Sequence, residues 1–343
     1  METPPIQRAL VTGATGMLGS YIVHRLLADG CAVRAVVRDI ARSEWLASLG
    51  VQLVRGELAD AASLRDGAAG CDVVFHAAAA IGPATAWEPF RAGNVEGTRH
   101  VIAACAHACA RLVYVSSTAV YGDSRYEHAP VDETAPLPVL PDRDAYGRSK
   151  QEAERAVLDA HAEGRVWGAS VRPPVMYGER DRQFVPRIAV VLARGIFPLI
   201  GGGVTTLPVV HANAVAEGAI AVARTAAAGG RVYNLTRDYP LTVADLVRFA
   251  AVGLDRHIWT PSTSRGAGRA LFRALALGLT AIGKGELAGH AFGTFEMLTH
   301  DNPFSEARAR HELAWRPTIV PETGVAEAFR WWAAHHRSTN ATR

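Results

Sequence analysis

Short, almost wholly apolar runs alternate with longer amphipathic stretches through the first half of the chain. Runs such as VVF and LVYV have no alternating polar face, which is typical of strands buried on both sides of a sheet. The stretches between them place apolar residues at helical spacing. This alternation predicts parallel βαβ units and therefore an α/β fold with a doubly wound sheet. The predicted strands are Arg8–Thr12, Ala32–Val37, Gln52–Arg55, Val73–His76, Leu112–Ser116 and Val166–Arg172, and the predicted helices are Leu18–Asp29, Ala61–Ala69, Phe90–Cys109 and Ala145–Ala162.

The pattern becomes less regular after Arg172, where helical stretches dominate. One further strand, Arg231–Leu235, is expected to return to the main sheet. We therefore predict a sheet domain of residues 1–172, completed by that strand, and a smaller, mainly helical lobe of residues 173–338. The second lobe does not repeat the first, so we expect it to bind the substrate. Its predicted helices include Pro186–Arg194, Ala214–Ala227 and Thr242–Val252, followed by a link at Ser262–Gly268.

Three segments have functional interpretations. Tyr121–Asp144 and Pro174–Pro186 are rich in proline and too long for simple connections, so we predict that they are binding loops. Ala270–Ile282 is apolar, but Arg273 interrupts it and it is too short to span a bilayer. We expect this segment to pack in the core. A hydrophobic lid over a bulky substrate and a helix at a membrane surface are the alternatives.

Composition narrows the class of protein. With 49% hydrophobic and 20% charged residues, the chain of 343 residues can bury a sizeable core, which excludes intrinsic disorder. Its 36 basic and 33 acidic residues leave a net charge of +3, too small for a nucleic-acid-binding surface. The N-terminus has no signal-peptide pattern, and four cysteines without metal-type spacing suit a reducing compartment. We therefore expect a cytoplasmic protein without a metal site, in which Cys105 and Cys109 are small buried residues.

A glycine-rich turn, LVTGATGMLGS, lies between the first predicted strand and the first predicted helix. Gly13 permits a tight turn, Gly16 lets a pyrophosphate approach the backbone, and Gly19 lets the helix pack closely on the strand. The helix N-terminus faces the phosphates with its partial positive charge. The sequence therefore predicts a dinucleotide-binding domain of the Rossmann type. The residues expected to bind the phosphates are Gly13, Thr15, Gly16, Met17, Leu18 and Gly19.

The TGxxGxxG spacing of this turn resembles that of the short-chain dehydrogenase/reductase superfamily, in particular its extended branch of NAD-dependent epimerases and dehydratases. In such folds an acid at the end of the second strand binds the ribose 2′-hydroxyl of NAD, whereas an arginine accommodates the 2′-phosphate of NADP. Here Val37 holds the acidic position, Arg38 follows it, and Asp39 comes one residue too late. We therefore expect NADP as the cofactor, with NAD as the alternative.

Two weaker signals follow the third and fourth predicted strands. Glu57 and Leu58 resemble the family's adenine-contacting GDL motif, with Glu in place of Asp. Ala77, Ala78 and Ala79 resemble the family's small-residue patch beside the adenine ribose. The resemblance implies that both segments contact the adenosine half of the cofactor.

The strongest catalytic signal is a tyrosine and a lysine four residues apart, Tyr146 and Lys150. On a helix this spacing puts both side chains on one face. An ammonium beside a phenol favours the phenolate, so we expect Lys150 to lower the pKa of Tyr146 and make it an acid/base group. Only two of the 36 basic residues are lysines, Lys150 and Lys284. A lysine is therefore unusual here, and its compact ammonium could contact both ribose hydroxyls and the phenol.

Further site residues follow from the same resemblance. The stretch SSTAVYG matches the family pattern SSxxVYG, which puts the catalytic serine at Ser117 and leaves Ser116 beside the cofactor. A serine at a strand end can donate a hydrogen bond to a substrate carbonyl oxygen. Asn94 lies in a match to the NVxGT motif, and the resemblance implies that it positions the lysine through water. RPPVMYG resembles the family's RPxxxYG, whose loop lies over the nicotinamide, so Pro173 and Val175 are expected cofactor contacts.

Two departures from the sugar-nucleotide enzymes of this family guide the choice of reaction. Dehydratases usually carry an acidic pair just after the serine, where this chain has Thr118 and Ala119. An RDFVHV-like stretch usually clamps the substrate diphosphate through its arginine, where this chain has Leu207. We expect His211, at the end of that stretch, to have a structural role.

These observations predict an NADP(H)-dependent oxidoreductase that resembles 3β-hydroxysteroid dehydrogenases and dihydroflavonol reductases. Its expected partner is a bulky hydrophobic alcohol or ketone. An NDP-sugar 4-epimerase with tightly bound NAD and a non-enzymatic dinucleotide sensor are the alternatives. The resemblance alone implies a homodimer through the helices that carry Thr98–Cys109 and Tyr146–Ala162.

Overall fold

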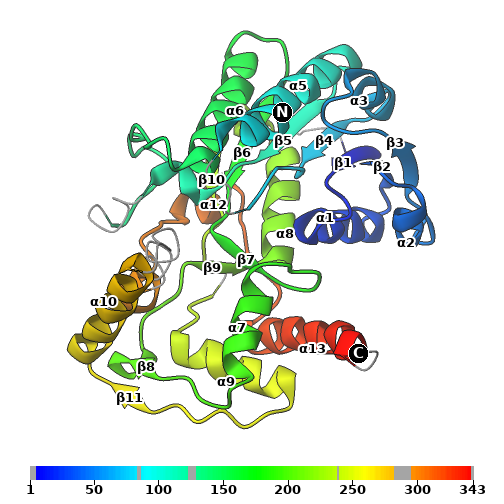
Figure 1. Cartoon of the computed structure of the whole chain (residues 1–343). Helices are drawn as coiled ribbons and strands as arrows, with labels where there is room; N and C mark the ends of the chain where they lie inside the picture. The colour runs from blue at the N-terminus through cyan, green and yellow to red at the C-terminus, as the bar shows by residue number, and fades with distance from the viewer. Residues whose placement is uncertain (1–4, 83–85, 123–128, 238, 282–294, 341–343) are drawn as a thin grey trace.

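The computed structural model of the chain describes residues 5–82, 86–122, 129–237, 239–281 and 295–340 (Figure 1). Its centre is a seven-stranded parallel sheet with the order β10-β6-β5-β4-β1-β2-β3. The strand order reverses at β1, which pairs with β2 on one side and β4 on the other, as in a doubly wound Rossmann sheet. The strands are β1 (Arg8–Thr12), β2 (Ala32–Val37), β3 (Gln52–Arg55), β4 (Val73–His76), β5 (Arg111–Val115), β6 (Gly168–Arg172) and β10 (Val232–Asn234).

The sheet confirms the predicted fold class and the return of the late strand. β10 pairs in parallel with β6, with Tyr233 opposite Val171. The division of the chain at residue 172 stays a prediction.

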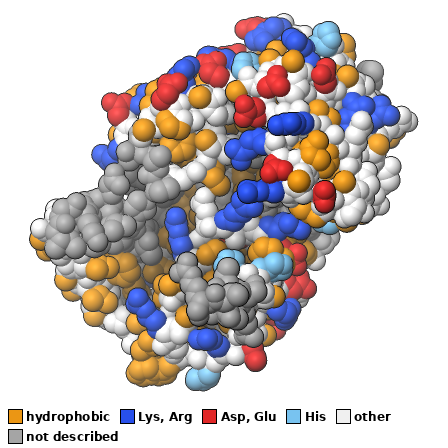
Figure 2. All heavy atoms as spheres, turned by 45° about the vertical axis from the view of Figure 1, so that its right-hand side comes forward, with side chains coloured by type: hydrophobic (Ala, Val, Ile, Leu, Met, Phe, Trp, Pro, Cys, Tyr) orange, Lys and Arg blue, Asp and Glu red, His pale blue; other side chains and the backbone are white. Residues whose placement is uncertain are grey.

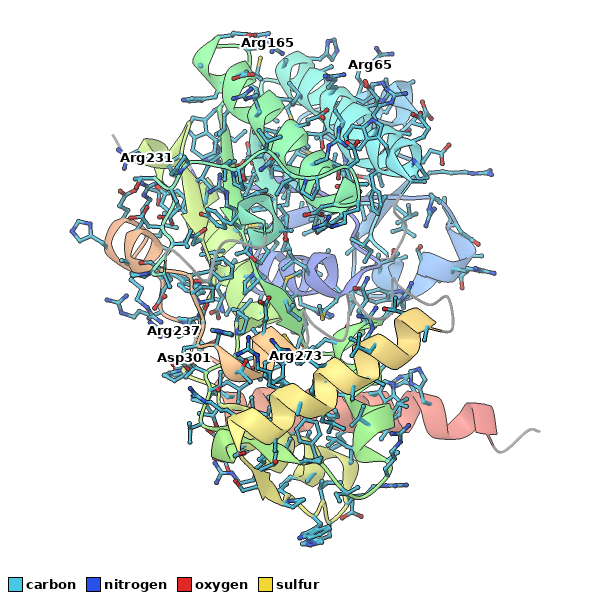
Figure 3. All side chains as sticks on the ribbon, turned by 60° about the vertical axis from the view of Figure 1, so that its left-hand side comes forward. Arg65, Arg165, Arg231, Arg237, Arg273 and Asp301 are labelled. Carbon is cyan, nitrogen blue, oxygen red and sulfur yellow. The ribbon has the colours of Figure 1, made fainter. Side chains whose placement is uncertain are left out.

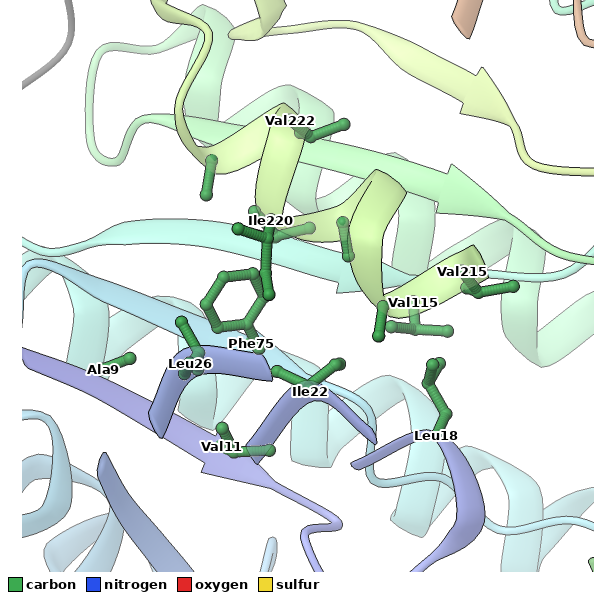
Figure 4. Close-up of a cluster of buried hydrophobic side chains, with 14 of the residues drawn as sticks. Ala9, Val11, Leu18, Ile22, Leu26, Phe75, Val115, Val215, Ile220 and Val222 are labelled. Carbon is green, nitrogen blue, oxygen red and sulfur yellow. The ribbon is translucent and has the colours of Figure 1, made fainter. Parts of the chain in front are cut away.

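Helices cover both faces of the sheet, because successive strand side chains point to opposite sides. On one face Val11 and Phe75 pack under α1 and α8, together with Ile22 and Ile220 (Figure 4). On the other face Leu10 and neighbouring side chains pack under α3, α5 and α6. The central strands β4, β5 and β6 are therefore buried on both sides, as the continuous apolar runs predicted, whereas the edge strand β3 is partly exposed. The covering helices are α1 (Met17–Ala28), α3 (Ala61–Ala68), α5 (Gly97–Ala108), α6 (Ala145–Ala162) and α8 (Ala212–Ala223).

The predicted single helix Phe90–Cys109 is wrong in its first part. The chain forms a short α4 (Trp87–Phe90), a π-helical turn at Arg91–Glu96, and only then α5. A π turn adds one residue to a helical turn, and the spacing of apolar residues in the sequence does not reveal it. The prediction therefore treated the whole stretch as one regular helix. Cys105 is buried on α5 as expected, whereas Cys109 is exposed at the end of the helix, with a left-handed φ of 53°.

Several short elements were not predicted, because two- to four-residue segments carry no periodicity. They include a strand, β7, inside the predicted loop Pro174–Pro186, and a strand and helix start inside the predicted link Ser262–Gly268. β7 (Val175–Tyr177) pairs with β9 (Val209–His211), and β8 (Leu199–Ile200) pairs with β11 (Ser262–Thr263). The other unpredicted short elements are α2 (Glu44–Ala47) and 3-10 turns at Ala41–Ser43, Thr118–Tyr121, Gly201–Gly203 and Ala226–Ala228. The six-residue helix α12 (Ala307–Glu312) precedes α13 (Pro321–Asn340).

A second hydrophobic core holds the smaller lobe together. It lies between α7 (Phe184–Leu192), α9 (Val243–Leu254) and α13 (Pro321–Asn340). The backbones of α9 and α13 meet at Gly253, where an added Cβ would lie 2.3 Å from the carbonyl oxygen of Ala326. This glycine therefore sets the distance between the two helices.

Helix α10 (Arg265–Ala281) lies on the outside of the smaller lobe, with Arg273 projecting from it (Figure 3). Phe272 packs against Phe295, at 5.4 Å between ring centroids, but Leu271, Leu275 and Leu277 are 50–73% exposed. The expected core packing is therefore wrong for these three leucines. No helix in the described ranges is both long enough and apolar enough to span a membrane.

We expect Gly253→Ala to lower the free energy of unfolding by about 1–3 kcal/mol, because the new methyl group forces α9 and α13 apart. Urea denaturation would measure the change. Gly278→Ala in α10 is the matched control, since nothing lies within 4 Å of a Cβ at that position. It should leave stability unchanged or raise it by up to about 1 kcal/mol. Equal destabilisation by both substitutions would contradict the close-packing account.

Candidate active site

The glycine turn lies at the carboxyl edge of the sheet, between β1 and α1. Gly13 has a φ of 73°, and an added Cβ there would lie 2.7 Å from the amide nitrogen of Ala78. At Gly19 an added Cβ would lie 2.1 Å from the carbonyl oxygen of Gly13. Gly16 occupies the N-cap of α1, and no side chain caps that helix end. The turn is thus a bare backbone cradle whose amides suit a dinucleotide diphosphate.

The alanine patch after β4 borders this cradle. Ala77, Ala78 and Ala79 are half-buried, and their backbone follows the turn closely. The Ala78 amide donates to Thr12 Oγ1 at 3.2 Å, and the Ala77 amide donates to the Thr12 carbonyl at 3.3 Å. The structure therefore brings the two predicted cofactor segments side by side.

A buried histidine, which the sequence reasoning gave no role, holds β1, β4 and α5 together below the cradle. His76 Nδ1 lies 2.7 Å from Thr12 Oγ1, and its Nε2 lies 3.1 Å from Thr98 Oγ1. Burial, followed by the charge of Lys150, lowers the pKa of His76 to about 3. The ring therefore stays neutral at ordinary pH and acts as a structural bridge. Only its place at the end of a strand could have signalled this.

The end of β2 presents Arg38 to solvent, next to a buried Val37. The carboxylate of Asp39 pairs with Arg42, three residues later. It accepts a hydrogen bond from the Arg42 amide at 3.1 Å and lies 3.4 Å from the Arg42 guanidinium. The end of this strand therefore presents a cation.

The two residues of interest after β3, Glu57 and Leu58, lie in different environments. Glu57 is exposed, whereas Leu58 lies under α5, where a Cβ at Gly97 would be 2.8 Å from the Leu58 Cβ. The Leu58 carbonyl lies 2.8 Å from His100 Nδ1. The described contacts of Leu58 are therefore structural, and its expected contact with adenine stays a prediction.

Ser117 and Tyr146 meet at the carboxyl end of β5. Ser117 caps the following 3-10 turn by accepting from the Ala119 amide at 3.1 Å, and Asp144 caps α6 by accepting from the Gly147 amide at 2.9 Å. The Ser117 hydroxyl and the Tyr146 phenol lie close enough to interact. Burial raises the pKa of Tyr146 above its usual value, although the Ser117 hydroxyl lowers it in part.

The expected lowering of the Tyr146 pKa by Lys150 is wrong for the protein alone. Lys150 Nζ instead donates to the Val115 carbonyl at 2.8 Å and lies 4.9 Å from the Tyr114 ring centroid. Burial lowers the pKa of Lys150 to about 7, and the nearby Glu154 carboxylate opposes this shift. Helical spacing puts the two side chains on one face, but here the ammonium donates to a backbone carbonyl.

Asn94 links the segment after β4 to α6. It lies in the π-helical turn, where its Oδ1 accepts from the Ala80 amide at 2.6 Å and its Nδ2 donates to Ser149 Oγ at 2.9 Å. Ser149 in turn donates to the Tyr146 carbonyl at 2.8 Å. Asn94 therefore reaches the first turn of α6 through direct contacts, and its water-mediated effect on Lys150 stays a prediction.

A buried ion pair fixes α6 to the sheet one turn beyond Lys150. The guanidinium of Arg172 contacts both oxygens of Glu154, and their side chains are 4% and 2% exposed. Arg172 also donates to the Tyr121 hydroxyl at 2.7 Å, which donates to Asn234 Oδ1 at 2.9 Å. Burial disfavours the charge on Arg172, but Glu154 more than compensates and raises the arginine pKa. Local sequence patterns do not indicate this network, because the two charged residues are 18 positions apart in the chain.

The remaining predicted residues lie around the same strand ends. Ser116 Oγ is buried and has no hydrogen-bond partner among the described residues. Pro173 is buried, and its carbonyl accepts from the Thr118 amide at 3.0 Å, whereas Val175 in β7 is 41% exposed. Their expected contacts with the cofactor stay predictions. Within the described ranges no cluster of three or more His, Cys, Asp or Glu side chains could hold a metal ion.

Residues 9–236 match the NAD dependent epimerase/dehydratase family. The chain belongs to this family. A ketoreductase from Stigmatella aurantiaca that acts on a 4-farnesyl-3,4-dihydroquinoline-1-oxide is 37% identical over 68% of this chain and 69% of its own length. A 3-beta-hydroxysteroid dehydrogenase from Mycolicibacterium neoaurum is 28% identical over 95% and 91% of the two chains. The family and these relatives identify the chain as an oxidoreductase of the extended short-chain dehydrogenase/reductase superfamily.

Solved structures agree on the fold of this family member. The crystal structure of gox2253 is 26% identical, with a TM-score of 0.73 over 96% of this chain and 99% of that one. A UDP-glucuronic acid 4-epimerase from Bacillus cereus, solved in complex with NAD, has a TM-score of 0.72 over 96% and 99% of the two chains. Since the epimerase is only 19% identical, it supports the fold alone.

Two residues on the substrate side bear on the choice of reaction. Leu207, where sugar-nucleotide enzymes usually carry an arginine, is 2% exposed and belongs to the core of the smaller lobe. His211 caps α8 by accepting from the Asn213 amide at 3.1 Å and packs edge-on against Tyr21 and Tyr177. Burial lowers the pKa of His211 to about 4. These contacts agree with the expected structural role of His211.

We expect Glu154→Gln to lower the free energy of unfolding by about 3–5 kcal/mol, because it leaves the buried Arg172 charge uncompensated. The control is Glu163→Gln, since Glu163 pairs with Arg165 at the surface, where the side chains are 57% and 51% exposed. That substitution should change stability by no more than about 0.5 kcal/mol. Urea denaturation of both variants tests the comparison, and a loss of similar size in both would contradict a special role for the buried pair.

Proposed function

We propose that the protein is an NADP(H)-dependent oxidoreductase that interconverts a secondary alcohol and a ketone on a bulky hydrophobic molecule. The observation that carries the proposal is the proximity of Ser117 and Tyr146 at the end of β5, with Lys150 one helical turn further along. The bare backbone cradle of Gly13, Gly16 and Gly19 supports a dinucleotide at the same edge of the sheet.

The proposed chemistry divides between the cofactor and the side chains. NADPH, when bound, supplies the hydride for the carbonyl carbon, and the oxidised form accepts it in the reverse direction. The Ser117 hydroxyl donates to the substrate oxygen as negative charge develops there. The Tyr146 phenol passes its proton to that oxygen and takes it back in the reverse reaction. Lys150 would hold the ribose of the nicotinamide half, and its charge together with that of the oxidised cofactor would lower the pKa of Tyr146.

The proposed substrate class rests on two polar groups that are missing from the predicted substrate side and on the named substrates of similar enzymes. The buried Leu207 provides no arginine for a diphosphate, and Thr118 and Ala119 provide no second acid/base pair. The named substrates of the ketoreductase and the hydroxysteroid dehydrogenase are large and lipophilic. We therefore favour an apolar ketone over a sugar nucleotide. A homodimer remains part of the proposal on family analogy alone.

One experiment separates the candidate functions. Purified protein is incubated with NADPH and a panel of bulky ketones, including steroid-like ones. The consumption of NADPH is measured as the decrease in its absorbance. Net consumption supports the ketoreductase. Tightly bound NAD after purification, with NDP-sugar interconversion and no net redox change, would establish a 4-epimerase instead. Binding without any turnover on either panel would favour a dinucleotide sensor.

Tyr146→Phe should reduce kcat for the ketone by at least about 10²-fold, because the phenolic proton is lost while the ring is kept. The affinity for NADPH, measured by fluorescence titration, should stay within about twofold of wild type. Tyr239→Phe is the matched control, since the Tyr239 hydroxyl donates to the Pro317 carbonyl at 3.0 Å. It should leave kcat unchanged. Near-wild-type turnover by Tyr146→Phe would remove Tyr146 from its proposed role.

Arg38→Asp should shift the preference for NADPH over NADH, as a ratio of kcat/KM values, by about tenfold or more toward NADH. The carboxylate repels the 2′-phosphate and accepts from the ribose 2′-hydroxyl of NADH. Arg65→Asp makes the same change of charge at an exposed position on α3 and should leave the ratio unchanged. An unaltered ratio in Arg38→Asp would refute the phosphate contact.

A further inference from the structure

A cavity of about 400 Å³ lies between the glycine turn and the smaller lobe. Thr15, from the turn itself, lines one side, and Trp331 and His336 of α13 line another. The remaining wall is the loop between β7 and α7, which contributes Arg180, Asp181 and Arg182. On the face that carries α1, α2 and the end of α13, basic side chains gather toward the middle (Figure 2). The cavity is thus cationic and borders the predicted phosphate-binding turn.

The loop is held against the nucleotide-binding domain at two successive residues. The Glu179 amide donates to the Tyr21 hydroxyl on α1 at 3.1 Å. The Arg180 guanidinium stacks on the indole of Trp45 in α2, 3.7 Å from the ring centroid. A guanidinium stacked in this way still has its in-plane N–H groups free to bind an oxyanion, often in a bidentate manner.

The backbone of Arg180 is strained to make this contact. Its φ is 66°, in the left-handed region that residues with a Cβ rarely adopt. Such strain persists where the surroundings enforce it, and it is concentrated at functional sites. Here Tyr21 and Trp45 hold the loop, and the result is an arginine directed to the boundary of the cavity.

Arg180 and Arg182 form no ion pair within the described residues. Burial lowers the pKa of Arg180, the charge of Glu179 opposes this shift, and repulsion by Arg182 adds to it. Asp181, the acid in the cavity wall, accepts from the amides of Gln183, Phe184 and Val185 at 2.7–3.2 Å. The Asp181 carboxylate therefore caps α7 and pairs with neither arginine, and the acid whose charge acts on Arg180 is Glu179.

We propose that Arg180, assisted by Arg182, binds the diphosphate of the dinucleotide from the side opposite the glycine turn. This inference rests on the proposed function, because it needs a dinucleotide in the cradle at Thr15. The diphosphate would then be held from both sides: by backbone amides at the start of α1 and by guanidiniums from the second lobe. Cofactor binding would thereby join the second lobe to the first.

Fluorescence titration of NADPH and NADH against the purified full chain tests the proposal. The principal variant is Arg180→Asn, because asparagine tolerates a left-handed φ and the loop should keep its shape. We expect the Kd of both cofactors to rise by about tenfold to a hundredfold, with a shallower dependence on salt. Arg180→Lys keeps the positive charge but loses the planar guanidinium, so its Kd for both cofactors should lie between those of wild type and Arg180→Asn. Arg187→Asn on the adjacent α7 removes the same charge outside the cavity and should bind both cofactors as wild type does.

The outcomes separate this inference from the proposed function. Wild-type protein that binds neither cofactor would overturn the proposed function itself. Wild-type binding with an unchanged Kd in Arg180→Asn would overturn only the arginine contact. A weaker affinity for NADPH alone would also overturn it, because the arginine would then face the 2′-phosphate. Thermal unfolding midpoints within about 2 °C of wild type show that the fold is intact.

Discussion

The buried ion pair between Glu154 and Arg172 is the contact on which the geometry of the candidate active site depends. It joins the middle of α6 to the last residue of β6, and through Tyr121 and Asn234 it reaches the loop after β5 and the strand β10. Two charges so fully enclosed are stable only if each satisfies the other. The pair therefore fixes the rotation of α6, and with it the side on which Tyr146 and Lys150 face the strand ends.

Much of the fold could be predicted because it follows from repeating patterns. Buried strands, amphipathic helices and a glycine turn are local features, and the structure places the seven main strands within a few residues of their predicted bounds. The meeting of Ser117 and Tyr146 was also predictable, since the family motifs put both at the carboxyl edge of the same sheet. Each of these inferences needs only the order of elements and the direction in which parallel strands run.

The rest depends on interactions between residues far apart in the chain. Helical spacing places Lys150 near Tyr146, but it does not show that the Val115 carbonyl competes for the ammonium. Charge pairing through the interior, as in Glu154 with Arg172, leaves no trace in a hydrophobic pattern. The exposed leucines of α10 look like core residues in sequence, because an outer helix and an inner one can share the same composition. Desolvation, which governs the pKa values of Tyr146 and Lys150, is likewise a property of the assembled molecule.

The π-helical turn at Arg91–Glu96 affects the directions in which neighbouring side chains point. One additional residue in a helix rotates everything before it by about 100° relative to everything after it. Asn94 can therefore face Ala80 and Ser149 while Thr98, in the next turn, still faces His76 under the sheet. This one segment thus contributes both to the packing of the domain and to the placement of α6.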